Sequence, residues 1–436
     1  MSYVPNPDSD REAMLASMGC SSMDGLFADI PAEVKLNRPL NLLPPASELE
    51  IQNRLKELAG KNISLENHPS FMGGGAYHHF APSLVDQLLL RSEFYTAYTP
   101  YQPEISQGIL QSIFEWQTYI CLLTGMDVAN ASMYDGASAL AEACLMSAAV
   151  TRRNKVVLPD NMNPAYIKVV KTYLHGKKIE VVILPTENGV ISPGQIKDLN
   201  DTTAAVVVQY PNYFGLLEPH LDGVTSAIHA AGGLLIMSAD PIALGVLKTP
   251  ADWGADLVVG DGQPLGLPLN YGGPYVGYLA AREKYTRFIP GRLVGQTLDS
   301  RGNVGYVLTL QAREQHIRRD KAGSNICSNE ALCALAATIY LASIGREGLT
   351  AVAKRCHQLA IYARNQLQKA GFTLLYQAPF FRELAVKVND PREANLRLWQ
   401  EGIIGGIELE NGLLLAFTEQ TTCEQIDRLA AVMGGK

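Results

Sequence analysis

The sequence has no excess of basic residues. Its 36 lysine and arginine residues stand against 43 aspartate and glutamate residues, which gives a formal net charge of −7. A chain of this charge has no basic footprint for nucleic acid or anionic lipid, so nucleic-acid binding is not expected. The seven cysteines include no Cys-x-x-Cys pair and no histidine at metal-binding spacing. This usage is typical of free thiols in a reducing compartment.

The sequence also lacks a long uninterrupted apolar run. The longest candidate, residues 331–345, is shorter than the ~20 residues of a membrane span, and Thr338 and Ser343 interrupt it. The first residues are acidic and polar, where a secretory signal would be basic and then apolar. We therefore expect a cytoplasmic protein that does not span a membrane.

The sequence has no lysine between Lys248 and Lys284, although the surrounding residues form a pattern in which a lysine is expected. An apolar run that reads as a buried strand leads to Asp240, and a second run, 255–261, leads into the glycine-rich stretch 262–273. Many pyridoxal-phosphate enzymes use this layout, in which the Asp pairs with the pyridinium nitrogen and a lysine forms the Schiff base. Here Gln263-Pro264 takes the lysine's place. The pattern predicts a cofactor fold that cannot hold the cofactor covalently.

The 436 residues are too many for one hydrophobic core, and their patterns predict three parts. Residues 1–70 read as a helical arm with a capping-box pattern at Ser47 and Glu50. Residues 71–315 alternate short apolar runs with helical patterns, which predicts a large α/β domain with a mainly parallel sheet covered by helices on both faces. Residues 316–436 predict a small α+β domain.

Within the predicted small domain, helical patterns at 330–341 and 349–370 precede strand-like segments at 372–376 and 383–388. A hairpin is expected to turn at Asn411-Gly412, a dipeptide that tolerates left-handed turn geometry.

The segment 93–117 is too unusual for generic core. Prolines at 100 and 103 forbid a continuous helix, so its polar and aromatic side chains are expected on a rigid extended loop that binds a partner or ligand. These candidate residues are Tyr95, Tyr98, Tyr101, Gln102, Glu104 and Ser106. The alternative, that the tyrosines only pack against the large domain, stays open.

Other candidates favour structural roles. Ser138 lies at the start of the helical run 139–149, where backbone amides could bind a phosphate, but the missing lysine favours a vestigial, structural role. Asp240 is expected to be satisfied by backbone amides. His78 and His79 are adjacent, so they point apart, and no third ligand is expected near them. No metal site is predicted.

Three long segments resemble glycine decarboxylase, the P-protein of the glycine cleavage system. They are residues 93–117, residues 123–136 (LTGMDVANASMYDG) and residues 313–327, which begin REQHIRRDK and end SNIC. The length and the lysine-free GDGQPLG at 260–266 more narrowly resemble the first subunit of the two-chain form, in which the second subunit carries the lysine. The sequence departs from the family at Gly323, where threonine is usual.

The resemblance implies a fold-type I, aspartate aminotransferase-like architecture and an α2β2 tetramer. It implies that glycine is decarboxylated and that its aminomethyl group passes to the lipoyl arm of the H-protein, with pyridoxal phosphate as electron sink on the partner subunit. In this chain Ser138 and Asp240 would be vestigial, and Pro264 would lie near the lost lysine position. In fold-type I dimers a neighbouring chain completes each site, so the tyrosine-rich loop is expected to reach into the partner's site.

Other functions remain open on the sequence alone. The chain could be a structural pseudoenzyme scaffold of another pyridoxal-phosphate enzyme, or a self-sufficient decarboxylase, against which the missing lysine counts directly. Neither Lys248 nor Lys284 is placed to substitute for it. A nucleotide-binding α/β protein is a further class, but residues 259–262 lack the Gly-x-Gly-x-x-Gly fingerprint.

Overall fold

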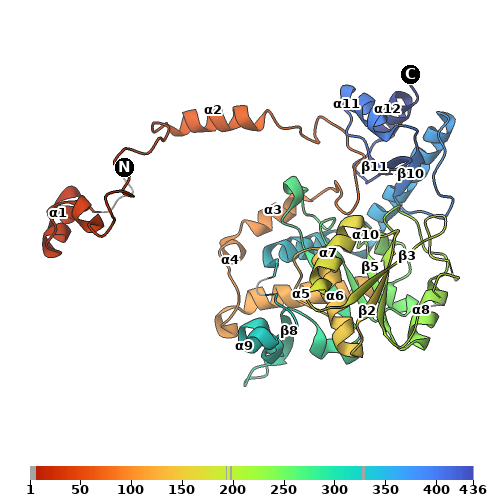
Figure 1. The fold of residues 1–436 in the computed structure, drawn as a ribbon, viewed down its shortest axis with the longest axis horizontal. Helices are drawn as coiled ribbons and strands as arrows, with labels where there is room; N and C mark the ends of the chain where they lie inside the picture. The colour runs from red at the N-terminus through yellow and green to blue at the C-terminus, as the bar shows by residue number, and fades with distance from the viewer. Residues whose placement is uncertain (1–5, 193, 197–198, 327–328, 436) are drawn as a thin grey trace. The chain divides into compact units, whose positions relative to one another are not determined.

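The computed structural model describes residues 6–192, 194–196, 199–326 and 329–435, which form two compact units, Met1–Ile63 and Ser64–Lys436 (Figure 1). The first unit contains α1 (Asp8–Ser17) and α2 (Glu48–Ala59). The predicted capping box is confirmed, because Ser47 N–H donates to Glu50 Oε2 (2.7 Å) and Glu50 N–H donates to Ser47 Oγ (3.3 Å). The expected division into three domains at residues 70 and 315 stays a prediction.

A seven-stranded sheet forms the centre of the second unit, in the order β1-β7-β6-β5-β4-β2-β3. Strands β2 to β6 pair in parallel, whereas β7 runs antiparallel to both β6 and β1. The predicted mainly parallel sheet is therefore confirmed. The strands are β1 (Val128–Ala129), β2 (Lys155–Pro159), β3 (Glu180–Leu184), β4 (Thr203–Tyr210), β5 (Leu234–Ala239), β6 (Leu257–Asp261) and β7 (Gly277–Ala281).

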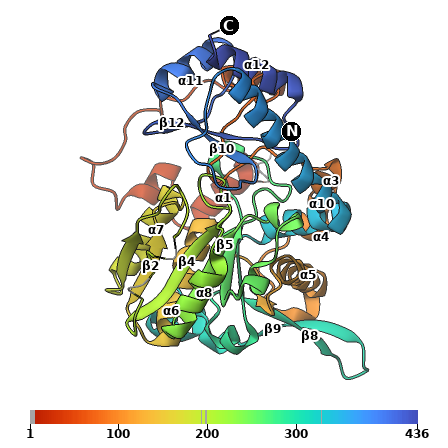
Figure 2. The same cartoon turned by 90° about the vertical axis from the view of Figure 1, so that its right-hand side faces the viewer.

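Helices cover both faces of this sheet (Figure 2), and the alternation of apolar residues along the strands explains why. In β4, Val206 and Val208 belong to one core cluster with Trp116, while Val207 belongs to the other with Leu140. The first cluster lies under α5 (Gln107–Thr124), α8 (Leu221–Ala230) and the first half of α10 (Ala331–Lys369); the second lies under α6 (Gly136–Thr151) and α7 (Pro164–His175).

A smaller antiparallel sheet, ordered β10-β12-β11, packs with the second half of α10 around a third core cluster. Its elements are β10 (Glu383–Lys387), β11 (Ile407–Leu409), β12 (Gly412–Ala416), α11 (Pro391–Gln400) and α12 (Cys423–Met433). A hairpin forms as predicted, but its turn is at residues 410–411 and not at Asn411-Gly412, because Leu409 pairs with Gly412, the first residue of β12. The predicted strand at 372–376 is wrong: Leu374 makes only an isolated bridge to Val386, and the chain then leaves β10 to bridge Leu216 at Phe380.

The two helices predicted at 330–341 and 349–370 form one element, α10, with a break at Gly345 (φ 60°, ψ −171°). By length and composition alone α10 could cross a membrane, but half of its most apolar window is buried within the protein. The hairpin of β8 (Leu293–Leu298) and β9 (Val304–Thr309) was not predicted from the sequence. The remaining α-helices are α3 (Ser83–Leu89), α4 (Ser92–Tyr95) and α9 (Gln315–Arg318).

The cysteines that the structure describes are free thiols, as expected: Cys20, Cys121, Cys144, Cys333, Cys356 and Cys423. Cys327, in one of the segments that carry the family resemblance, lies outside the described residues.

Candidate functional site

A cleft lies at the carboxyl ends of β5 and β6, the edge of an open parallel sheet where ligands usually bind. Asp240 follows β5 directly, and Asp261 is the last residue of β6, so both carboxyl groups line the cleft. Arg382 and Glu383, at the start of β10, add to its wall. The cavity that remains measures only about 50 Å³.

The position of the missing lysine is filled by Gln263, whose side chain is fully buried. Its amide nitrogen donates to the carbonyl oxygens of Tyr77 (2.9 Å) and Leu267 (2.8 Å), and its amide oxygen accepts from Tyr77 N–H (2.9 Å). The side chain thus ties the irregular segment around Tyr77 to the loop that follows β6. Pro264 lies beside it in the wall of the cleft.

Asp240 has a cationic partner within the chain. Its Oδ2 forms an ion pair with Arg382 Nη2 at 2.5 Å, and its Oδ1 accepts from Ile242 N–H at 2.9 Å. The expectation that backbone amides alone satisfy this carboxylate is therefore incomplete. The guanidinium of Arg382 is thus paired with the carboxylate that a pyridinium nitrogen would need. Arg382 is fully buried, and its guanidinium carbon lies 3.6 Å from the centre of the Tyr77 ring.

The start of α6 is closed by two of the chain's own carboxyl groups. Asp135 accepts from Ser138 N–H (2.7 Å) while Ser138 Oγ accepts from Asp135 N–H (3.1 Å), a reciprocal capping box. Asp261 accepts from Gly136 N–H (3.0 Å) and from Gln263 N–H (2.8 Å). Burial raises the pKa of Asp261 to about 7. These bonds use amides at the helix start that a bound phosphate would require.

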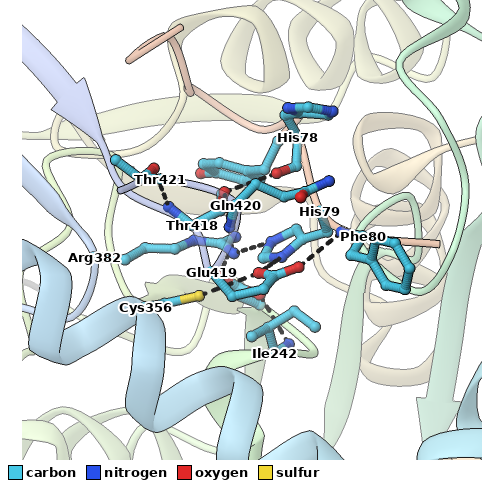
Figure 3. A network of polar contacts seen from close by, with 12 residues as sticks. His78, His79, Phe80, Ile242, Cys356, Arg382, Thr418, Glu419, Gln420 and Thr421 are labelled. Carbon is cyan, nitrogen blue, oxygen red and sulfur yellow. Dashed lines mark hydrogen bonds and ion pairs between the residues drawn. The ribbon is translucent and has the colours of Figure 1, made fainter. Parts of the chain in front are cut away.

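Arg382 continues into a buried polar chain that links the segment before α3 to the residues next to β10 and β12 (Figure 3). Its Nη1 lies 2.5 Å from His79 Nε2, and His79 Nδ1 lies 2.6 Å from Glu419 Oε2. Burial lowers the pKa of His79, so the neutral ring accepts from Arg382 at Nε2 and donates to Glu419 at Nδ1. Although burial alone would raise it, the hydrogen bond from His79 lowers the pKa of Glu419 to about 2.

The expectation that no third ligand group lies near His78 and His79 is wrong. His79, Cys356 and Glu419 have potential ligand atoms within 4.8 Å of one another, which the sequence could not reveal because their positions are far apart in the chain. Both nitrogens of His79 are already bonded, however, and the positive charge of Arg382 at Nε2 opposes a cation there.

The residues of the cleft do not fit pyridoxal phosphate. No lysine lines the cavity, Asp240 is paired with Arg382, and the carboxyl group of Asp261 occupies helix-start amides that a phosphate would need. A second negative group placed beside Asp261 would be repelled. The small remaining cavity agrees with this conclusion.

The candidate binding segment, residues 95–106, presents its rings to the surface. Tyr95, Tyr98 and Tyr101 are 63%, 81% and 60% exposed, and Gln102 and Glu104 are also exposed. The segment is not one extended loop as predicted. Tyr95 ends the short helix α4, and Pro103–Ile105 forms one 3-10 turn, because proline at the first position of a turn is favourable.

The anchor of this segment is Gln107, which the sequence reasoning missed. Its Nε2 donates to Pro103 O (2.7 Å) and Tyr306 O (2.9 Å), and its Oε1 accepts from Tyr306 N–H (2.8 Å). The bonds fix the segment to β9. Within the described residues the side chains of Gln102, Glu104 and Ser106 form no hydrogen bond, so their expected role in holding the loop finds no support in this chain. The Tyr101 ring lies 5.7 Å from the buried guanidinium of Arg292.

The lysines flanking the gap have other partners. Lys248 Nζ lies 4.0 Å from the centre of a Trp253 ring, and Lys284 Nζ lies 3.6 Å from Asp256 Oδ1. Neither lysine lines the cleft.

Comparisons with known proteins agree on one family. The family described as "Glycine cleavage system P-protein" matches residues 1–433. The chain is 57% identical over 437 residues to "Probable glycine dehydrogenase (decarboxylating) subunit 1" of Syntrophomonas wolfei, covering 100% of both chains. It is 50% identical to the protein of the same name from Anoxybacillus flavithermus, covering 99% of this chain and 98% of that one.

Solved structures give the same result. A glycine decarboxylase (P-protein) of the glycine cleavage system, in inhibitor-bound form, superposes with a TM-score of 0.92 at 41% identity and covers 100% of both chains. A glutamate decarboxylase from Lactobacillus brevis has a TM-score of 0.68 at 12% identity, covering 93% of this chain and 95% of that one, which is a likeness of fold alone.

Proposed function

The chain belongs to the glycine cleavage system P-protein family, and we propose that it acts as the subunit of a glycine dehydrogenase (decarboxylating) that completes its neighbour's site. The family predicted from the sequence is confirmed, as is the aminotransferase-like α/β fold. The name "subunit 1" that its relatives bear implies a second subunit as partner. Pyridoxal phosphate belongs to this enzyme system, and in our proposal the second subunit carries it.

The proposal rests mainly on the burial and hydrogen bonding of Gln263. A side chain that is fully buried and makes three hydrogen bonds is an integrated part of the fold. Together with the Arg382–Asp240 ion pair, it leaves this chain without the groups that would bind the cofactor. The chain's contribution to decarboxylation is then made at the surface it offers to its partner.

We assign that contribution to the segment 95–106. Its rings are exposed, and its base is fixed by Gln107, so it combines free side chains with a defined position. In the partner's site Tyr95, Tyr98 and Tyr101 line the glycine or lipoyl side. Gln102, Glu104 and Ser106 hold the segment there through bonds to the partner, since their side chains make none with the described residues of their own chain.

The same reasoning extends to assembly. An α2β2 tetramer that receives the lipoyl arm of the H-protein in the cytoplasm fits the proposed division of labour. Residues 1–46 carry exposed apolar side chains that favour contact with a neighbouring subunit, including Met14, Met18, Leu26, Phe27 and Leu42.

Reconstitution tests the proposal. The purified chain is expected to be colourless and inactive in glycine–bicarbonate exchange, and to support exchange only after mixing with the second subunit. Sedimentation of the mixture should reveal the tetramer, and removal of residues 1–46 should weaken it. Exchange by the lone chain well above buffer would overturn the assignment, and an unchanged sedimentation profile of the shortened chain would remove the arm from it.

A further inference from the structure

A second cavity, of about 220 Å³, lies between α6 and residues 313–326 and shares no lining residue with the cleft. We name it the Arg313 cavity. About 10 to 15 Å³ is enough to hold one water, so this cavity has room for a small molecule. Its wall includes Glu142, Arg313, Glu314 and Ser324, and exposed basic residues border it at Arg287, Arg318 and Lys321.

Arg313 has two buried donors without a partner. Its Nη1 donates to the carbonyl oxygen of Ile289, but its Nε and Nη2 have no hydrogen-bond partner among the described residues. These two atoms form one edge of the guanidinium, the edge that grips a carboxylate through two parallel bonds. A buried donor left unpaired is costly, which favours a ligand carboxylate at this edge.

Glu314, next to Arg313, has a buried acceptor without a partner among the described residues. Its side chain is buried, and its Oε1 has no hydrogen-bond partner in the part of the chain that the structure describes. Its Oε2 faces His316 Nδ1 at 3.6 Å. Within the same described residues no ion pair joins Glu314 to Arg313, so the neighbouring charges do not satisfy each other. An ammonium group would supply the missing donor.

We propose that the Arg313 cavity binds a small zwitterionic amino acid, with its carboxylate on Arg313 Nε and Nη2 and its ammonium on Glu314 Oε1. A simple anion would leave the carboxylate of Glu314 unpaired, and a simple amine would leave the donors of Arg313 unpaired. The basic residues at the border raise the local concentration of carboxylates. Burial raises the pKa of Glu142 to about 7, so this residue adds only part of a negative charge near neutrality.

This inference goes beyond the proposed function, because the cavity lies in this chain and needs neither cofactor nor partner. Calorimetric titration of the full chain without the second subunit tests it, with glycine, acetate and methylamine as probes. Glycine should bind saturably, and acetate and methylamine should each bind at least about tenfold more weakly, since each leaves one buried charge unpaired. Equal affinity for acetate and glycine, or no binding at about 10 mM glycine, would overturn the proposal.

Two substitutions locate the site. Arg313→Lys keeps the charge but removes the bidentate edge, and Glu314→Gln keeps the shape but removes the charge. Each should weaken glycine binding about tenfold or more, whereas the border control Arg318→Lys should change it by less than about threefold. Thermal unfolding verifies that each variant folds, and unchanged affinity in a folded Arg313→Lys chain would refute the assignment. Exchange activity is not measured, so failure here leaves the proposed function standing.

Discussion

The cleft and the segment 95–106 use their polar side chains in opposite ways. In the cleft Arg382 is fully buried, and its charge is paired with Asp240 at 2.5 Å. In the segment Tyr98 is 81% exposed, and the anchoring bonds come from the following residue, Gln107. The polar groups of the cleft are therefore paired within the chain, whereas the segment has side-chain donors and acceptors that can bind another molecule.

This difference indicates a structural role for the cleft and a role in catalysis for the segment. The cleft lies at the carboxyl ends of the strands, where open parallel sheets usually bind ligands, yet its Asp240 pairs with Arg382, which continues through His79 to Glu419. The groups of the cleft are thus hydrogen-bonded or ion-paired within the chain. Substitutions in the cleft should act mainly on folding, and substitutions in the segment should act mainly on turnover by the assembled enzyme.

The largest effect is expected for Arg382→Ala. It leaves the carboxylate of Asp240 buried without its partner and removes the donor to His79, so the free energy of unfolding should fall by about 3 to 5 kcal/mol. Urea denaturation of the lone chain measures this change. The exposed control Arg392→Ala should lose less than about 0.5 kcal/mol. Similar losses in the two variants would mean that the cleft is not a structural joint.

Asp261→Asn should alter how stability depends on pH. Burial raises the folded-state pKa of Asp261 from 3.8 to about 7, so its stabilising contribution is complete below the unfolded value and is lost as the pH rises through 7. Asparagine removes this loss and keeps one oxygen acceptor. The stability of the variant relative to the wild-type chain should therefore increase between about pH 5 and about pH 8.

Denaturation at those two pH values measures the change, with Asp222→Asn, an exposed residue on α8, as control. A relative stability of Asp261→Asn that stays constant across the range would show that the carboxyl group is not desolvated in the folded chain.

The sequence predicted local features better than the contacts between them. The parallel sheet and the β11–β12 hairpin, whose turn lies one residue before the predicted Asn411-Gly412, follow from patterns that span only a few residues. The gap at Gln263 was equally visible. Its clamp was not, because the partner, Tyr77, lies 186 positions away. Nothing in the neighbouring sequence marks a residue whose hydrogen-bond partner is so distant in the chain.

The candidate site shows the same limit. Prolines at 100 and 103 correctly indicated a break in the helix, but Gln107 was missed because its partner Tyr306 is 199 positions away, on a hairpin that was itself not predicted. The strand predicted at 372–376 failed for a related reason: its apolar residues suit a strand, but the chain leaves β10 after Leu375, which donates to Ala385 O at 2.8 Å. Tertiary pairing decides such short segments.

Gln263→Lys tests whether the lysine alone separates the cleft from a cofactor site. Asp261 and Arg382 would still occupy the positions that the phosphate and the ring nitrogen need, so the variant should develop no visible absorbance with added pyridoxal phosphate. It should also lose about 1 to 3 kcal/mol of stability, because Tyr77 loses a buried hydrogen-bond partner. Gln263→Leu, which adds no amine, should lose a similar amount. Stable colour in the lysine variant would show that the cleft remains competent.

The smallest expected change in free energy, and the one confined to turnover, is that of Tyr98→Phe. The Tyr98 hydroxyl is exposed in the isolated chain, so its removal should leave the melting temperature and subunit association nearly unchanged. If the hydroxyl bonds a charged group in the partner's site, exchange by the assembled enzyme should fall about tenfold or more. Simple packing predicts the reverse, a lower melting temperature with normal turnover. Tyr173→Phe, a partly exposed tyrosine on α7, serves as control. Normal turnover in Tyr95→Phe, Tyr98→Phe and Tyr101→Phe alike would contradict the catalytic role of the segment. The segment would then have a structural role only, as the cleft has.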